Sequence, residues 1–154
     1  MAVRPENVPS VGPRERDTDV RRTWHPVRVS TTRGRILVLR HGETDWSAAG
    51  LHTGRTDIPL NDDGVSRACA LRPRLEAWSS ARCLSSPLQR ARRTAVLAGF
   101  HPEPDDDLAE WDYGEFEGRT TDEIRTSLKD PAWSVWTATA GLGESLETVG
   151  QRAD

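Results

Sequence analysis

The sequence has only two cysteines among its 154 residues, Cys69 and Cys83, and they show neither CxxC spacing nor a dense pairing pattern. Disulfide scaffolds and cysteine-based metal sites both use closely spaced sets of cysteines. We therefore expect two reduced, buried thiols in a cytoplasmic protein, with neither a structural disulfide nor a bound metal.

Long apolar runs are also missing. No stretch approaches the roughly 20 apolar residues that cross a bilayer, and the N-terminal residues lack the apolar core of a secretory signal. The formal net charge of -3 gives no general attraction to nucleic acid. We therefore expect a cytoplasmic protein whose partners include neither a membrane nor a nucleic acid.

Apolar residues make up only 35% of the chain, which is low for a compact domain and indicates that part of it does not pack. Residues 1–34 contain four prolines and almost no apolar periodicity. We interpret them as a disordered N-terminal extension, in which His25 is inert, and residues 35–154 as one domain. Eight arginines among residues 1–35 leave a nucleic-acid arm as an alternative, although four acidic residues interrupt them and only Trp24 could stack on a base.

Residues 36–46, ILVLRHGETDW, are the most informative stretch. Four branched aliphatic residues predict a buried strand, which stops at Arg40 and His41. Gly42 then allows a sharp turn. The strand would thus deliver a cation and an imidazole to its own carboxyl end, where α/β sheets hold their sites.

The next residues predict an access loop and a helix. Residues 47–60 contain Gly and Pro without a period, so we expect a loop over the strand end. Asn61 or Asp62 can cap a helix that runs to about residue 79, with Cys69 beside its apolar stripe. Pro73 should kink or split this helix because it removes a backbone donor.

A second strand and helix carry a candidate anion site. We expect a strand at residues 82–85 and a helix that starts at Ser86 and Pro87 and ends before Gly99. The amides of its first turn favour an anion, and Arg90 one turn later can add a bidentate guanidinium. The alternative is that Arg90 and the arginines after it only solvate an exposed helix face.

Residues 108–118, LAEWDYGEFEG, place four carboxylates among aromatic residues and glycines. Such a cluster usually serves solubility. A carboxyl of Glu110 packed against Trp111 and Tyr113 would be desolvated, which favours the protonated form that a general acid needs. Further on, a capping box at residues 120–123 predicts a short helix, and residues 143–145 open another.

Four ordered segments resemble signatures of the histidine phosphatase superfamily, which includes the cofactor-dependent phosphoglycerate mutases. They are RHGET at residues 40–44, SxLxRAxxTA at 86–95, LxExxxGxxxG at 108–118 and GES at 143–145. The resemblance implies that His41 is the phosphorylated nucleophile and that Arg40 and Arg90 hold the transferred phosphate. It extends over residues 35–154.

The same resemblance implies roles for the loop and for the acidic segment. Glu110 would donate the proton to the leaving group, with Asp112 as the fallback. The Thr53-Gly54 pair would reach the substrate or its phosphate. His52 beside this pair is expected to be a polar loop residue, with a substrate contact as the minority interpretation.

The family implies a three-layer α/β/α sandwich with a mostly parallel central sheet. It also implies phosphate-monoester hydrolysis through a phosphohistidine, without a metal or another cofactor. The segments EWDYGEFEG and HTGRTDIPL look most like members related to sedoheptulose-bisphosphatase and acid phosphatase, so a small sugar phosphate is the expected substrate. Mutases insert a long basic segment after the acidic loop, and here that interval is short.

Relatives complete the pocket with a second histidine near the C-terminus, and no histidine follows Glu110 here. We therefore expect a domain truncated at its C-terminal end, with an incomplete sheet. Two alternatives remain: phosphoryl transfer of the mutase type, and an inactive pseudo-phosphatase that only binds anions. A homodimer is left open.

Overall fold

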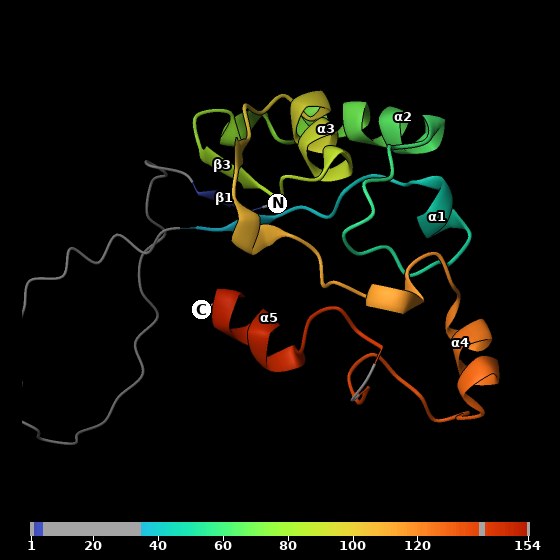
Figure 1. Cartoon of the computed structure of the whole chain (residues 1–154). Coiled ribbons are helices and arrows are strands. Elements are labelled where there is room, and N and C mark those ends of the chain that lie inside the picture. The colour runs from blue at the N-terminus through green and yellow to red at the C-terminus, as the bar shows by residue number, and fades with distance from the viewer. Residues whose placement is uncertain (1, 5–34, 139–140, 154) are drawn as a thin grey trace, which may run out of the picture.

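The computed structural model describes residues 2–4, 35–138 and 141–153, whose arrangement is shown in Figure 1. Its helices and strands are β1 (Ala2–Arg4), β2 (Leu37–Val38), α1 (Asp45–Ala48), α2 (Asp62–Leu71), β3 (Arg82–Ser85), α3 (Gln89–Leu97), β4 (Glu103–Pro104), α4 (Thr121–Leu128) and α5 (Leu146–Ala153). Single 3₁₀ turns cover Arg72–Arg74, Glu76–Trp78, Asp106–Leu108 and Gly114–Phe116.

The described strands form one sheet in the order β2-β1-β3-β4. Strands β3 and β4 pair in parallel, whereas β1 pairs antiparallel with both β2 and β3. Strands β2, β3 and β4 therefore run in one direction, as a parallel sheet requires, and β1 opposes them. The chain is a mixed α/β protein.

Strand β1 lies in the segment that we interpreted as a disordered extension. Val3 is in register with Leu37 on one side and with Cys83 on the other. The interpretation is therefore wrong at Ala2–Arg4, because the free backbone groups of β2 and β3 offer these residues hydrogen-bond partners that composition cannot reveal. Residues 5–34 lie outside the described residues.

Only one face of β2 is covered, and that face is partly buried. Leu37 and Leu39 pack against the core cluster formed by Cys83, Ala95, Ala98 and Phe100, on the side of the sheet where Figure 1 shows α2 and α3. On the other face Ile36 and Val38 are 60% and 74% exposed. The prediction of a buried strand is wrong for that face; α5, the last helix described, packs against the turn Asp106–Leu108. The second helical layer of the expected sandwich is thus incomplete among the described residues.

Helix α2 begins and ends as its sequence predicts. The side chain of Asn61 accepts a hydrogen bond from the Gly64 amide at 2.8 Å, and Pro73 converts the end of the helix into 3₁₀ turns. The predicted burial of Cys69 is wrong: its thiol is exposed, whereas Cys83 is buried. The helix buries the neighbouring position, Ala68.

Helix α3 begins later than expected. Leu88, in extended conformation, is its N-cap without a side-chain hydrogen bond, and the first helical residue is Gln89. The Ser86 hydroxyl accepts a long hydrogen bond of 3.4 Å from the Leu88 amide, so it stabilises the turn before the helix. Gly99 follows the helix with φ +96°, a conformation that glycine adopts without strain.

A second core lies between the acidic segment and the C-terminal part. Phe116, Ile124 and Trp133 are its buried members, and the rings of Phe116 and Trp133 meet edge to face at 5.1 Å. The predicted capping box is confirmed, because Thr120 and Glu123 bond each other's backbone amides and so fix α4. Ile124 of that helix is fully buried.

Arg152 fixes α5 to the acidic segment. Its guanidinium donates to both carboxylate oxygens of Glu144, at 2.7 and 3.0 Å, and to the carbonyls of Asp107 and Ala109, at 2.7 Å each. Hydrogen bonding to Arg152 lowers the pKa of Glu144 below its ordinary value near 4.5. Trp111 Nε1 donates to the Glu144 carbonyl at 2.7 Å, so Glu144 joins α5 to the segment that carries Glu110.

Ile124→Ala should destabilise the protein by about 2–5 kcal/mol, because a fully buried side chain leaves a cavity beside Phe116 and Trp133. The matched Ile124→Val change should lower the free energy of unfolding by only about 0.5–1.5 kcal/mol. Urea unfolding of both variants measures the difference. Equal, small effects would show that this cluster does not form a packed core.

Arg152→Met should lower the free energy of unfolding by about 3 kcal/mol, because it leaves the carbonyls of Asp107 and Ala109 without this donor and leaves the Glu144 carboxylate only the long contacts of the Asp112 amide and Arg55. Since Arg152 depresses the pKa of Glu144, this stabilisation is present above pH 4.5 and is lost as the pH falls through the folded-state pKa. The exposed neighbour change Gln151→Met is the control. Urea unfolding at pH 7 and pH 3.5 tests both points, and an equal difference at the two pH values would contradict the ion-pair account.

Candidate active site

The Arg40-His41-Gly42 motif is fixed to α3 by its backbone. The Gly42 amide donates to Thr94 Oγ1 at 2.9 Å, and this hydroxyl donates in turn to the Arg90 carbonyl at 2.7 Å. Thr94 is buried, so no water competes for its oxygen. These two hydrogen bonds therefore fix the end of β2 to the middle of α3.

The motif also contacts the first turn of α2 closely. A Cβ atom on Gly42 would lie 2.7 Å from the Gly64 carbonyl oxygen, so only glycine fits there. The Asn61 amide donates to the Glu43 carbonyl at 3.0 Å, and its side chain donates to Glu43 Oε1 at 3.1 Å. Glu43 thus connects the motif to the helix cap.

His41 is held in one tautomer. Its Nδ1 lies 2.7 Å from the Gly42 carbonyl oxygen, which can only accept, so Nδ1 carries the proton and Nε2 keeps its lone pair. Burial lowers the pKa of His41 below 6.5, and Arg90 and Arg40 lower it further, against the hydrogen bond to Gly42 and the Glu110 carboxylate. The imidazole is therefore neutral at neutral pH.

Arg90 is 2% exposed and holds the loop after α1. Its guanidinium donates to the carbonyls of Thr53, Gly54 and Thr56, at 3.3, 2.8 and 3.0 Å. These bonds use three of its five N–H donors. The alternative that Arg90 only solvates a helix face is wrong; Arg92 and Arg93, which are exposed, do lie on the solvent side of α3.

The same loop is held from its other side by Glu117. Its carboxylate accepts from the Arg55 and Thr56 amides, at 2.6 and 2.8 Å. Burial opposes the charged form of Glu117, yet the hydrogen bonds from Thr56 and Arg55 lower its pKa below the ordinary value. Glu117 and Arg90 therefore form a clamp on residues 53–56.

The predicted Thr53-Gly54 pair contributes its backbone to this clamp. Thr53 Oγ1 donates to the Leu51 carbonyl at 3.0 Å, so its hydroxyl is engaged locally. Gly54 is buried, and a Cβ atom there would lie 2.6 Å from Glu117 Oε1. The pair thus lies beside Arg90, and its carbonyls are the atoms that contact the arginine.

Glu110 is brought to the site, although its expected desolvation is wrong. It raises the pKa of His41 and of Arg90 through its charge. Its side chain is exposed, however, and Oε1 accepts from the Trp111 amide at 2.9 Å. Trp111 is buried against Glu144 and leaves Glu110 open to solvent. The fallback Asp112 accepts from the Gly114 amide at 2.9 Å and so stabilises a turn.

The sequence did not single out Tyr113 as a polar group near the site. Burial and the Glu110 charge raise the pKa of Tyr113, while Arg40 and Arg90 lower it. Its phenol therefore lies in the field of the same charged groups as His41. The sequence showed only an aromatic neighbour of Glu110, and no spacing rule distinguishes a phenol at a site from a packing ring.

His52 lies in a different environment. Its ring centroid is 4.9 Å from that of Tyr113 and 5.8 Å from that of Trp133, and Nε2 lies 3.1 Å from Thr121 Oγ1. Burial lowers the pKa of His52 below 6.5. The residue therefore packs the loop onto α4 and the second core.

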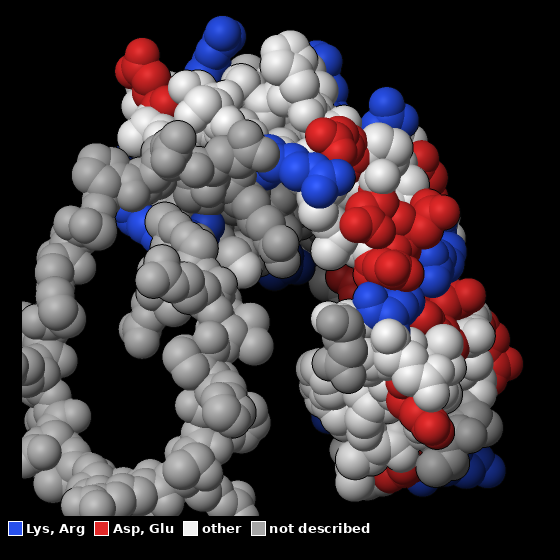
Figure 2. Space-filling view, turned by 90° about the vertical axis from the view of Figure 1, so that its left-hand side faces the viewer, with Lys and Arg blue, Asp and Glu red and all other residues white. Residues whose placement is uncertain are grey.

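The described residues contain no group of three or more His, Cys, Asp or Glu placed to hold a metal ion. None of the helices described is long and apolar enough to cross a membrane. In Figure 2 acidic and basic side chains intermingle on the face that is visible. At the site itself, a neutral imidazole, two guanidinium groups, a carboxylate and a phenol act on one another, which suits chemistry on an anionic group.

Comparison with known proteins identifies this arrangement. The family model of the histidine phosphatase superfamily (branch 1) matches residues 36–154. An acid phosphatase of Mycobacterium tuberculosis is 46% identical over 124 residues, which cover 78% of this chain and 60% of that protein. The sedoheptulose 1,7-bisphosphatase of Saccharomyces cerevisiae is 33% identical over 143 residues, or 77% of this chain and 52% of the yeast protein.

Solved structures agree in fold. An open reading frame product of Mycobacterium tuberculosis matches with a TM-score of 0.64 and 43% identity, over 73% of this chain and 59% of that chain. A phosphoglycerate mutase of Thermus thermophilus matches with a TM-score of 0.58 and 34% identity, over 73% and 64% of the two chains. The protein thus spans between half and two thirds of the length of these relatives. Over residues 36–154, the chain belongs to branch 1 of the histidine phosphatase superfamily.

Proposed function

We propose that this chain carries the site of a phosphomonoesterase that hydrolyses a small sugar phosphate through a phosphohistidine. The observation that supports it best is the state of His41. Nδ1 donates to the Gly42 carbonyl, so Nε2 is left unprotonated within the field of Arg40 and Arg90. A neutral imidazole beside two cations is a nucleophile suited to an anionic phosphoryl group.

In the first proposed step, His41 Nε2 attacks phosphorus as the bond to the ester oxygen breaks. Arg40 and the two remaining N–H donors of Arg90 neutralise the phosphoryl oxygens. Glu110, in its protonated form, gives its proton to the departing alkoxide, and the alcohol leaves. The step needs no metal, since the developing charge is matched by the guanidinium groups.

In the second step, water attacks the phosphohistidine and the P–N bond breaks. The Glu110 carboxylate takes one proton from the water, and the electron pair of the broken bond returns to Nε2. Inorganic phosphate then leaves, and both His41 and Glu110 regain their starting forms. The exposure of Glu110 supports this role, because water reaches its carboxylate directly.

The relatives named acid phosphatase and sedoheptulose 1,7-bisphosphatase support hydrolysis of a small phosphorylated sugar. Phosphoryl transfer of the mutase type is an alternative, since a phosphoglycerate mutase of Azorhizobium caulinodans is 35% identical over 126 residues. The free thiols of Cys69 and Cys83 support a cytoplasmic location.

A second candidate is an anion-binding module without turnover. It is favoured by Arg90, which already donates to three loop carbonyls and so acts as a structural residue here. In that case phosphate would bind and stabilise the chain, and no ester would be cleaved.

The His41→Ala variant should lose phosphatase activity by about a thousandfold or more, because the nucleophile is removed. Para-nitrophenyl phosphate and a panel of sugar phosphates measure turnover, and labelled substrate should leave an acid-labile phosphoenzyme only on the unaltered chain. His25→Ala, outside the described residues, is the matched control. Thermal stabilisation by phosphate without turnover in the unaltered chain would overturn hydrolysis in favour of the binding module.

The His41 imidazole should titrate with a pKa below 6.5 in the free protein, chiefly because burial disfavours its charged form. Arg40→Gln removes one of the two repelling charges, so the pKa of His41 should rise while burial still depresses it. Proton NMR of the imidazole C2 resonance follows both, with assignment by loss of the signal in His41→Ala.

Since Nε2 attacks only when unprotonated, kcat/KM should fall as the pH drops through the same pKa. The acid limb should therefore lie below pH 6.5, and it should move to higher pH in Arg40→Gln. A pKa of His41 that is unchanged or lower in Arg40→Gln would show that Arg40 does not act on the imidazole.

A further inference from the structure

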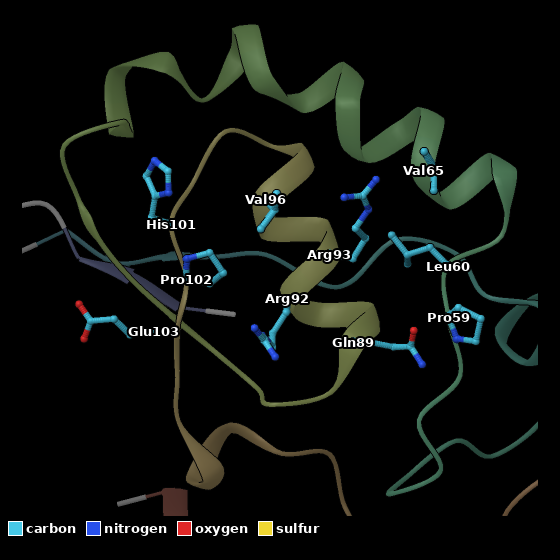
Figure 3. A pocket seen from close by; sticks show the side chains of 10 residues that line it. All are labelled: Pro59, Leu60, Val65, Gln89, Arg92, Arg93, Val96, His101, Pro102 and Glu103. Carbon is cyan, nitrogen blue, oxygen red and sulfur yellow. The ribbon is translucent and has the colours of Figure 1, made fainter.

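A pocket of about 830 Å³ lies on the outer side of α3, between that helix, residues 59–65 and residues 101–103 (Figure 3). We propose that it binds a small organic anion with an apolar body, at a site separate from His41. Its volume falls within the roughly 300–1,000 Å³ of small-molecule sites.

The pocket and the catalytic groups occupy opposite faces of α3. Arg90 and Thr94 are buried on the inner face, where they hold the loop and the Gly42 amide. Arg92, Arg93 and Val96 are exposed and line the pocket. A ligand in the pocket would therefore contact none of the groups that act on phosphate in the proposed reaction.

The charges in the pocket favour an anion. The guanidinium groups of Arg92 and Arg93 make no hydrogen bond or ion pair with another described residue. The acid of the lining, Glu103, is engaged by Arg82, whose guanidinium donates to Oε2 at 2.8 and 3.2 Å. Two guanidinium groups are thus left to bind a carboxylate, sulfonate or phosphate, and each can do so in bidentate geometry.

The rest of the lining favours an apolar body on that anion. Val96 is 49% exposed, and Leu60, Val65 and Pro102 line the pocket with it. In Figure 3 Arg93 lies on the side of Val65 and α2, and Arg92 on the side of residues 102–103, so the cations reach the apolar surface from different directions. An inorganic anion alone would leave this apolar surface wet, whereas an amphipathic anion would cover it.

The pocket wall is joined to the loop that Arg90 holds. The Gln89 amide donates to Asp57 Oδ1 at 2.8 Å, and its side chain donates to the Asp57 carbonyl at 2.7 Å. Because the pocket and the proposed phosphatase site are connected through these bonds, the probe should be a compound that the phosphatase site cannot hydrolyse. Sulfonates meet this need, because they carry no transferable phosphoryl group.

The test is calorimetric titration of the full chain with naphthalene-2-sulfonate, against the neutral naphthalene-2-sulfonamide and inorganic sulfate. The sulfonate should bind at least tenfold more tightly than either. Arg92→Gln/Arg93→Gln should weaken binding at least tenfold, and Val96→Asp, which places a negative charge on the apolar surface, should do the same. Arg74→Gln/Lys129→Gln removes two positive charges elsewhere and should leave binding unchanged.

Three results would overturn the proposal. The neutral sulfonamide could bind as tightly as the sulfonate, which would show that the cations do not select the ligand. A second contrary result is that Arg92→Gln/Arg93→Gln and Val96→Asp both leave binding unchanged, although circular dichroism shows that both variants are folded. Arg40→Gln could weaken sulfonate binding tenfold while Arg92→Gln/Arg93→Gln leaves it unchanged, which would place the probe at the His41 site.

Discussion

The buried guanidinium of Arg90 is the constraint on which the rest of this site depends. A cation that is 2% exposed must have its charge and its donors matched, since an unpaired buried charge is strongly destabilising. Three backbone carbonyls of residues 53–56 supply that match from one side. Glu110, Asp57 and Glu117 favour its charged form against burial. The loop and the acidic segment therefore have to fold around one side chain.

Helix α3 transmits this constraint to the Arg40-His41-Gly42 motif. Its Thr94 hydroxyl receives the Gly42 amide and returns a hydrogen bond to the Arg90 carbonyl, so the position of Arg90 and that of His41 are linked through one turn of helix. Glu144 and Arg152 perform the corresponding task for the acidic segment, since they hold Trp111 and the carbonyl of Ala109. The acidic segment and the Arg40-His41-Gly42 motif meet where the charge of Glu110 acts on the His41 imidazole.

Local signals in the sequence were sufficient where local chemistry decides the structure. The Asn61 cap, the break at Pro73 and the Thr120–Glu123 box each depend on neighbours within four residues, and each is present. The family motifs also named His41, Arg90 and Glu110, whose charges act on one another in the structure. Features set by distant contacts could not be predicted in this way. The exposure of Glu110 depends on Trp111 turning toward Glu144, the pairing of β1 depends on two strands far along the chain, and the polar role of Tyr113 depends on charges from three segments.

Arg40 and Arg90 both place a positive charge beside the His41 imidazole. After burial, these charges further disfavour the protonated form of His41, and in the proposed reaction they would also attract the phosphoryl group that the neutral imidazole attacks. Glu110 works against the first effect, because its negative charge raises the pKa of His41. In the proposed reaction Glu110 carries a proton in the first step, and without its negative charge this opposition would be absent. Under that proposal, the form of the site that protonates the leaving group would also be the form in which Glu110 no longer raises the pKa of His41.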